Sequence, residues 1–271
     1  MSIITISRGS YSRGKEVAEK VAEKLGYTAV SREIILETSE EFNIPEIKLI
    51  RAIHDAPSIL ERFTFGRERY LAHIESTILE HFRKDNVVYH GLAGHFFVRA
   101  IPHVLKVRII ADFQDRVKTK RTRKNISKER ALEELKKDDK ARRQWSLKLY
   151  GVDTWDPSLY DLVLHIHKLT IENAANIICN TVKLEQFRTT PASQRAMDDL
   201  ALAAMVKAEL IKKYPNIKVR VDAGEALVHV QASETLESEI AADIECVSKQ
   251  VPGVKKVMVH LVPTTLFDGR L

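Results

Sequence analysis

The sequence contains very little cysteine. Among its 271 residues only Cys179 and Cys246 are cysteines, and they lie far apart in the chain. Each falls in an apolar pattern of helical spacing, so we expect two buried thiols rather than a disulfide bond or a metal site. Histidines, cysteines and carboxylates are not grouped at the spacing of metal ligands, and we expect no structural metal site. No spacing indicates a nucleophile paired with its base.

Long hydrophobic runs are also absent. No apolar stretch approaches the roughly 20 residues that span a bilayer. The first residues, MSIITISRGS, lack the basic and apolar regions of a signal peptide. We therefore expect a cytoplasmic protein with no transmembrane segment. The net charge of +6 suits an anionic partner such as a nucleotide, a nucleic acid or a phospholipid surface, without choosing among them.

The first part of the chain alternates strand and helix patterns. Ile3, Ile4 and Ile6 predict a buried strand, and a helical pattern follows the loop at residues 7–14 and ends at Gly26. This alternation indicates an α/β fold with a parallel sheet flanked by helices, which binds ligands beyond the carboxyl ends of its strands. Further strands are predicted at residues 87–90, 105–111 and 162–166, and further helices at residues 127–150 and 170–182.

A second pattern begins after residue 195. The periodicity lapses over residues 184–195, where Thr189, Thr190, Pro191 and Ser193 indicate a linker. The chain is long enough for two domains, which we place at residues 1–184 and 196–264. The second domain is predicted to be a small α+β domain with the order helix, strand, strand, helix, strand. Its helices are expected at residues 199–214 and 236–250, its strands around 217–221, 228–232 and 257–261, with a turn at Gly224.

A phosphate-binding motif lies between the first strand and the first helix. The stretch GSYSRGK, which begins at Gly9 and ends at Lys15, fits the pattern G-x-x-x-x-G-K. Backbone N–H groups of such a loop converge on phosphate oxygens, the helix adds its positive end, and the lysine reaches the β and γ phosphates. The alternative is a tight turn with a solvated lysine. The candidate phosphate-binding residues are Gly9, Ser10, Tyr11, Ser12, Arg13, Gly14, Lys15 and Glu16.

The motif departs from the usual pattern at its eighth position. Glu16 stands where a serine or threonine hydroxyl normally binds magnesium. Ser10 and Ser12 are the alternative sources of a hydroxyl, and the sequence does not decide between them.

Two stretches resemble the cytidylate kinase-like family. DDKARRQWSLKLYGVDTWDPSLYDLVLHIHKLTIENAANII is similar to the lid and the final strand and helix of that family, and ITISRGSYSRGKEVAEKVAEKLG is similar to its first strand, phosphate loop and helix. The resemblance covers about residues 1–183. It implies a P-loop kinase fold with a helical lid, and phosphoryl transfer from ATP to a nucleoside monophosphate, typically CMP or dCMP, with Mg²⁺.

The resemblance also implies roles for basic residues. Arg116 and Arg142 match lid positions and are, with Lys15, the candidate catalytic residues, and Arg143 is a neighbouring candidate. Positioning and charge neutralisation are what phosphoryl transfer mainly requires. The alternative is that these arginines are ordinary solvated charges.

The acceptor side departs from the family. Gly91-Leu92-Ala93 replaces a Gly-Arg-Gly turn whose arginine helps to hold the acceptor, and Ser31-Arg32-Glu33 replaces a segment led by aspartate. A catalytically impaired nucleotide sensor is therefore the alternative function. Histidines 90, 95, 165 and 167 are expected to make ordinary hydrogen bonds at strand ends. The arginines that could compensate for Leu92 are Arg62, Arg67, Arg69 and Arg99.

The second region resembles a BON domain. The matching text is DDLALAAMVKAEL and IKVRVDAGEALVHVQASETLESEIAADIECVSKQVPGVKKVMVHL. The resemblance implies an interaction module for protein or phospholipid without catalytic residues, and a homo-oligomer is an alternative. The basic run at residues 116–124 raises nucleic-acid binding as a third function, but it lacks interleaved aromatic residues, so we expect no nucleic-acid partner.

Overall fold

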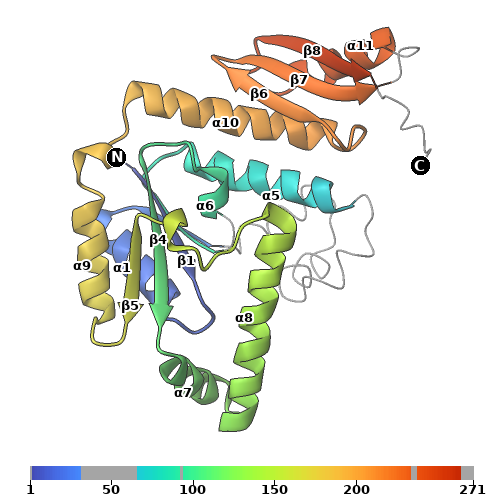
Figure 1. Cartoon of the computed structure of the whole chain (residues 1–271). Coiled ribbons are helices and arrows are strands. Elements are labelled where there is room, and N and C mark those ends of the chain that lie inside the picture. The colour runs from blue at the N-terminus through green and yellow to red at the C-terminus, as the bar shows by residue number, and fades with distance from the viewer. Residues whose placement is uncertain (1, 32–65, 92–93, 233–236, 264–271) are drawn as a thin grey trace. The chain divides into compact units, whose positions relative to one another are not determined.

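Figure 1 shows the computed structural model, which describes residues 2–31, 66–91, 94–232 and 237–263. The chain divides into two compact units. One comprises Met1–Phe63 and Lys84–Ser193, and the other comprises Thr64–Arg83 and Gln194–Leu271. None of the described helices combines the length and the apolar character needed to cross a membrane.

The first unit is an α/β fold around a parallel five-stranded sheet in the order β2-β3-β1-β4-β5. The strands predicted at residues 87–90 and 162–166 are confirmed, and the strand predicted at 105–111 begins one residue earlier. The strands are β1 (Ile3–Arg8), β2 (Thr28–Ser31), β3 (Val87–His90), β4 (Val104–Ala111) and β5 (Leu162–Ile166).

Helices α1 (Gly14–Leu25) and α9 (Ile171–Thr181) pack beside this sheet (Figure 1). Val21 of α1 and Ile178 of α9 belong to one buried core with Ile4 of β1, and all three are fully buried. The apolar stripe along each helix explains this packing, because only one face of each is hydrophobic. The short helices of this unit are α6 (Gly94–Phe97), η1 (Pro157–Leu159) and η2 (Glu185–Phe187).

The strand order creates a switch point at β1. From this central strand the chain first leaves for β2 and β3 on one side and later crosses to β4 on the other. Loops at the carboxyl ends of strands diverge at such a point and leave a crevice for ligands. The segment between β1 and α1, which contains the predicted phosphate loop, lies there.

Two consecutive helices, α7 (Phe113–Lys124) and α8 (Lys128–Tyr150), follow β4. Local signals explain their bounds: the Asp112 carboxylate accepts from the Gln114 N–H at the start of α7, and the Ser127 hydroxyl accepts from the Arg130 N–H at the start of α8. Gly151 ends α8 in a left-handed conformation. The pair has a small core of its own, formed by Val117, Ala131 and Leu135 with Tyr11, Phe113, Ile126 and Leu132 packed against it.

The second unit contains the predicted order helix, strand, strand, helix, strand. Strands β6 and β7 are antiparallel, and β7 and β8 are parallel. Helix α5 (Gly66–Phe82), from earlier in the sequence, also belongs to this unit: Ala72 joins its core beside Leu202, and Lys207 pairs with Glu75 at 3.2 Å. The other elements are α10 (Pro191–Leu210), β6 (Lys218–Asp222), β7 (Glu225–Ala232), α11 (Glu237–Lys249) and β8 (Lys256–Pro263).

Two local predictions were wrong. Pro191 and Ser193 are not part of a linker but of the first turn of α10. The Ser193 N–H donates to the Thr190 hydroxyl at 3.1 Å, and the Thr190 N–H donates to the Ser193 hydroxyl at 2.9 Å, so the polar cluster caps a helix.

The second wrong prediction concerns a cysteine. Cys179 is buried as expected, but Cys246 is exposed. It lies two residues from buried Ile244 on α11, a spacing that places it on the opposite side of the helix.

Candidate active site

The loop between β1 and α1 is tightly curled. Tyr11 and Arg13 both have left-handed backbone conformations, with φ of 60° and 64°. Ser12 closes the turn, because its N–H and its hydroxyl both donate to the Gly9 carbonyl, at 3.3 and 2.9 Å. A left-handed residue other than glycine costs about 1–2 kcal/mol, and such strain often accompanies function. Turns of this kind form backbone concavities that bind anions.

A cavity of about 340 Å³ opens beside this loop. Gly9 and Ser12 line it together with four arginines, each from a different element of the first unit. Among the described residues that line it, Asp139 is the one acidic side chain. The excess of positive charge favours an anionic ligand. The arginines are Arg8 at the end of β1, Arg108 on β4, Arg116 on α7 and Arg142 on α8.

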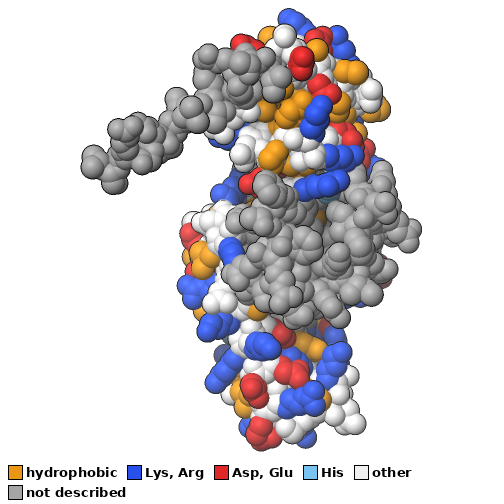
Figure 2. Space-filling model, turned by 90° about the vertical axis from the view of Figure 1, so that its right-hand side faces the viewer, with side chains coloured by type: hydrophobic (Ala, Val, Ile, Leu, Met, Phe, Trp, Pro, Cys, Tyr) orange, Lys and Arg blue, Asp and Glu red, His pale blue; other side chains and the backbone are white. Residues whose placement is uncertain are grey.

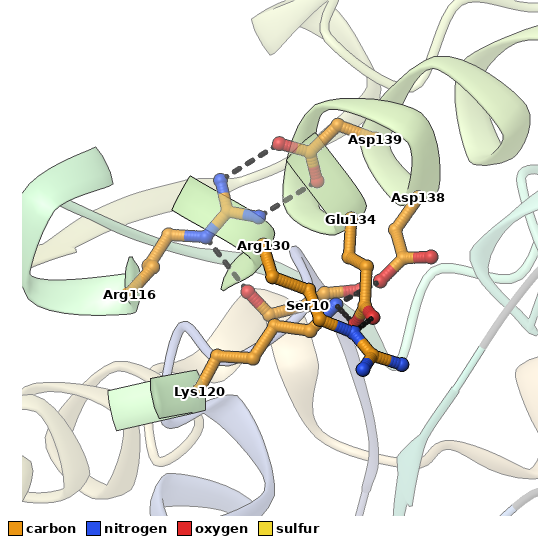
Figure 3. Close-up of polar contacts among 7 residues, drawn as sticks. All are labelled: Ser10, Arg116, Lys120, Arg130, Glu134, Asp138 and Asp139. Carbon is orange, nitrogen blue, oxygen red and sulfur yellow. Dashed lines mark hydrogen bonds and ion pairs between the residues drawn. The ribbon is translucent and has the colours of Figure 1, made fainter. Parts of the chain in front are cut away.

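Arg116 is held against both the loop and the neighbouring helix (Figure 3). Its Nε donates to the Ser10 carbonyl at 2.7 Å, and its two terminal nitrogens donate to the Asp139 carboxylate at 2.9 and 2.7 Å. The side chain is only 11% exposed. This predicted residue therefore lies at the cavity, and Arg142 also lines it.

Lys15 and Glu16, which were also predicted to bind phosphate, do not line the cavity. Lys15 is exposed, and its Nζ lies 3.6 Å from the Glu19 carboxylate one turn further along α1. The Glu16 carboxylate pairs with Arg13 at 2.8 Å and also with Arg123. Gly14 is the first residue of α1.

Lys120 is a buried residue beside this loop that the sequence did not single out. Its side chain is 5% exposed, its ammonium lies 3.0 Å from Glu134 and 3.1 Å from Asp138, and it lies 5.5 Å from the centre of the Tyr11 ring. Burial lowers the pKa of Lys120, but hydrogen bonds to the two carboxylates outweigh burial and raise the pKa overall. The charged lysine therefore links the loop between β1 and α1 to α7 and α8. Because the neighbouring residues in the sequence are also basic, the sequence does not distinguish Lys120 from a solvated lysine.

Tyr160 connects three residues that line the cavity, namely Ser7 of β1, His95 and Arg108. Its hydroxyl lies 3.2 Å from Ser7 Oγ and 3.3 Å from His95 Nε2, and it accepts a hydrogen bond from Arg108 at 3.3 Å. Burial, and then the charge of Arg108, lowers the pKa of His95 to about 3, so the ring is neutral near pH 7. His95 makes an ordinary hydrogen bond as predicted, but it lies in helix α6 rather than at a strand end, and it also lines the cavity.

Arg143 does not line the cavity. It donates to Asp153 at 2.9 and 2.6 Å and lies 4.9 Å from the centre of the Trp155 ring. The hydrogen bond from Arg143 lowers the pKa of Asp153. This contact attaches the C-terminal half of α8 to the segment before η1.

Several residues of the acceptor side lie outside the described residues: Arg32, Glu33, Arg62, Leu92 and Ala93, together with the side chain of Arg67. Arg69 belongs to the second unit. The Arg99 guanidinium lies 5.3 Å from the centre of the Phe96 ring. In the part of the chain that the structure describes, no three metal-ligating side chains come together.

Three archaeal cytidylate kinases are similar to the chain: that of Sulfolobus acidocaldarius is 25% identical over 180 residues, covering 66% of this chain and 93% of that protein. That of Ignicoccus hospitalis is 29% identical, covering 61% and 90%. That of Archaeoglobus fulgidus is 26% identical, covering 68% and 97%.

Among solved structures, an uncharacterised protein from Eubacterium ventriosum aligns with a TM-score of 0.49 at 22% identity, covering 67% of this chain and 98% of its own. Shikimate kinase from Acinetobacter baumannii aligns with a TM-score of 0.40 at 11% identity, covering 68% and 96%. These structural alignments are weak, whereas the sequence model of the cytidylate kinase-like family matches residues 3–168, more than half of the chain. The chain therefore belongs to the cytidylate kinase-like family.

Proposed function

We propose that this protein is an ATP-dependent nucleoside monophosphate kinase that phosphorylates CMP or dCMP in the cytoplasm. The observation that carries the proposal is the strained loop after β1 beside a cavity lined by four arginines. Backbone N–H groups at a helix start and clustered guanidinium groups are what a polyphosphate requires. The archaeal relatives named cytidylate kinase support the choice of acceptor.

The chain's own residues would act mainly by position and charge. In this proposal the loop would cradle the donor phosphates, and Arg116 and Arg142, which line the cavity, would neutralise charge that develops on the transferred group. The acceptor phosphate oxygen is already anionic, so no side-chain base is required. The neutral His95, which lines the same cavity, is held in place by the Tyr160 hydroxyl 3.3 Å from its Nε2.

Magnesium would enter with ATP and neutralise charge on its phosphates. Ser12 and Asp139 supply oxygen atoms at the cavity. The Ser12 hydroxyl donates to Gly9 and so keeps acceptor capacity on its oxygen. This set fits Mg²⁺, which kinases hold through one or two side chains together with phosphate and water. Glu16 does not line the cavity and is therefore not part of this set.

The test is an acceptor panel. Purified protein is incubated with ATP and Mg²⁺ and with CMP, dCMP, UMP, AMP or GMP, and ADP formation is followed. We expect CMP and dCMP to give the highest turnover. Arg142→Met should lower it, whereas Lys140→Met, which removes an exposed charge from the same helix, should not. No ADP formation above the rate without acceptor would contradict the proposal.

A nucleotide sensor is the second candidate. The engagement of Glu16 with Arg13 and Arg123 favours it, because the usual magnesium hydroxyl is missing there. A sensor would bind ATP in calorimetry without transferring phosphate to any acceptor of the panel.

We also propose that residues 196–264 form a BON-like interaction module for protein contact or self-association. The order and pairing of its helices and strands support this reading. Light scattering of the full chain with and without ATP tests self-association, and sedimentation with anionic vesicles tests lipid contact. Acidic and basic side chains are interspersed on the face in Figure 2, which favours protein over nucleic acid as a partner.

A further inference from the structure

Three of the side chains that line the cavity are large, apolar and exposed. Ile110 of β4 and Val163 of β5 are 36% and 42% exposed, whereas their chain neighbours Ile109 and Leu164 are buried. Trp155, in the segment before η1, is 56% exposed. All three exposed side chains line the cavity. Exposed apolar surface inside a concave site is typical of a place where a ligand binds.

The strand register groups two of these side chains with an arginine. Arg108 of β4 pairs in register with Val163 of β5, and Ile110 follows Arg108 by two residues on the same strand. Because alternate residues of a strand point to the same face, these three side chains lie on one face of the sheet. The cavity therefore presents cationic and apolar surface side by side, which suits a ligand with an anionic part and an apolar part.

The third apolar side chain, Trp155, is held in place by its neighbours. Its backbone N–H donates to Asp153 Oδ1 at 3.0 Å, and the other oxygen of that carboxylate accepts from Arg143 at 2.9 and 2.6 Å. The Arg143 guanidinium lies over the indole ring, 4.9 Å from its centre. A cation over one face of a ring attracts it without covering the other face. A ring that is already held loses less freedom when a ligand arrives.

We infer that Trp155 stacks against the base of a nucleotide in this cavity, with Ile110 and Val163 completing the apolar contact. The inference rests on the proposed function in that a nucleotide occupies the cavity. Every base is planar and has a π face, so an indole ring is a suitable partner for it. ATP and the acceptor both carry such a base, and separate titrations distinguish them.

The test measures binding to the full-length protein by calorimetry. ATP is compared with inorganic tripolyphosphate and CMP with ribose 5-phosphate, so that each nucleotide has a partner ligand without the base. Trp155→Ala should weaken the binding of at least one nucleotide roughly 5-fold to 150-fold, which corresponds to the loss of one base stack. The affinities for the two ligands without a base should stay unchanged. Trp155→Phe, which keeps an aromatic ring, should lose less.

Leu147→Ala is the matched control. Leu147 is also a large apolar side chain, 45% exposed, but it does not line the cavity. Its replacement should leave all four affinities unchanged. A loss for ATP alone assigns the contact to the donor base, and a loss for CMP alone assigns it to the acceptor base.

Fluorescence gives a second readout that a purely structural role of the ring would not change. The chain has two tryptophans, so Trp145→Phe leaves Trp155 as the source of indole emission. The nucleotide whose base stacks should quench this emission, and the ligands without a base should not.

Equal affinities of the wild type and of Trp155→Ala for both nucleotides would overturn the inference. A loss that is as large for tripolyphosphate or ribose 5-phosphate as for the matching nucleotide would overturn it as well. Failure of the proposed function is visible separately, as nucleotide binding that Trp155→Ala weakens but that leads to no transfer in the acceptor panel.

Discussion

Arg116 of α7 and Asp139 of α8 form an ion pair through two hydrogen bonds of 2.9 and 2.7 Å. The same guanidinium donates to the Ser10 carbonyl in the phosphate loop (Figure 3). One side chain thus connects two helices and the loop, so the position of the helix pair and the shape of the loop depend on each other.

The first prediction concerns this ion pair. Arg116→Ala should lower the free energy of unfolding by about 2 kcal/mol, because a carboxylate and a carbonyl in a partly buried place lose a charged donor. Denaturant unfolding of the full chain measures the change. In a double-mutant cycle with Asp139→Ala, we expect a coupling energy of about 1–2 kcal/mol. Strictly additive effects would show that the pair contributes nothing.

A second prediction concerns Lys120. Lys120→Met should destabilise the protein by about 1–2 kcal/mol, since Glu134 and Asp138 lose a buried charged partner. Lys118→Met, two residues earlier and exposed, is the matched control and should change stability by less than about 0.5 kcal/mol. Thermal or urea unfolding distinguishes the two. Equal effects would mean that burial of Lys120 has no energetic role.

The third prediction is a pH dependence that arises from His95. Its pKa is lowered to about 3, first by burial and then by nearby arginines. Below the ordinary histidine pKa of about 6.5, the unfolded chain binds a proton that the folded protein does not. Stability contributed by the neutral ring is therefore complete above that pH and is lost as pH falls toward 3.

Between pH 7 and pH 5 this linkage should remove about 2 kcal/mol of stability. In the variant His95→Gln, which retains a polar group near Tyr160, the free energy of unfolding should fall by about 2 kcal/mol less over this pH range than in the wild type. Unfolding by guanidinium chloride at pH 7 and at pH 5 measures the free energy of unfolding of both proteins. His73 and His103 also have lowered pKa values, caused mainly by burial, but they are present in both proteins and cancel. A variant with the same pH dependence as the wild type would refute the assignment.

A fourth prediction uses two adjacent residues in the hairpin between β6 and β7. Gly224 has a φ of 85°, and a Cβ there would lie 3.0 Å from the Gly253 carbonyl oxygen. Gly224→Ala should therefore cost about 1–3 kcal/mol. Ala223 also has a positive φ, of 49°, so Ala223→Gly should range from neutral to about 1 kcal/mol stabilising. Thermal unfolding of both variants measures these changes in stability. A lower melting temperature for both variants would contradict this account.

Local patterns predicted much of the fold. The strands at residues 87–90 and 162–166 have the predicted bounds, and α8 begins after Ser127 and ends before Gly151 as its caps require. The same local reasoning failed at Thr190, because a cluster of threonine, proline and serine is typical of both linkers and helix caps.

The candidate site was less predictable. The sequence selected the loop at residues 9–16, of which Gly9 and Ser12 line the cavity, and it selected Arg116 and Arg142, which line the cavity as well. It did not select Lys120, because the neighbouring residues do not distinguish a buried lysine from a solvated one. It did not select Tyr160, whose partners Ser7 and His95 lie far away in the sequence.

The sequence by itself determined where strands and helices form, since periodicity, caps and turn residues act over a few positions. Only the tertiary structure decided that Trp155 lines the cavity together with Ile110 and Val163, and that α5 contributes Ala72 to the core of the second unit. The physical reason is that a side chain's direction and burial depend on which distant segments pack around it, and that packing is a property of the whole fold rather than of any short stretch of chain.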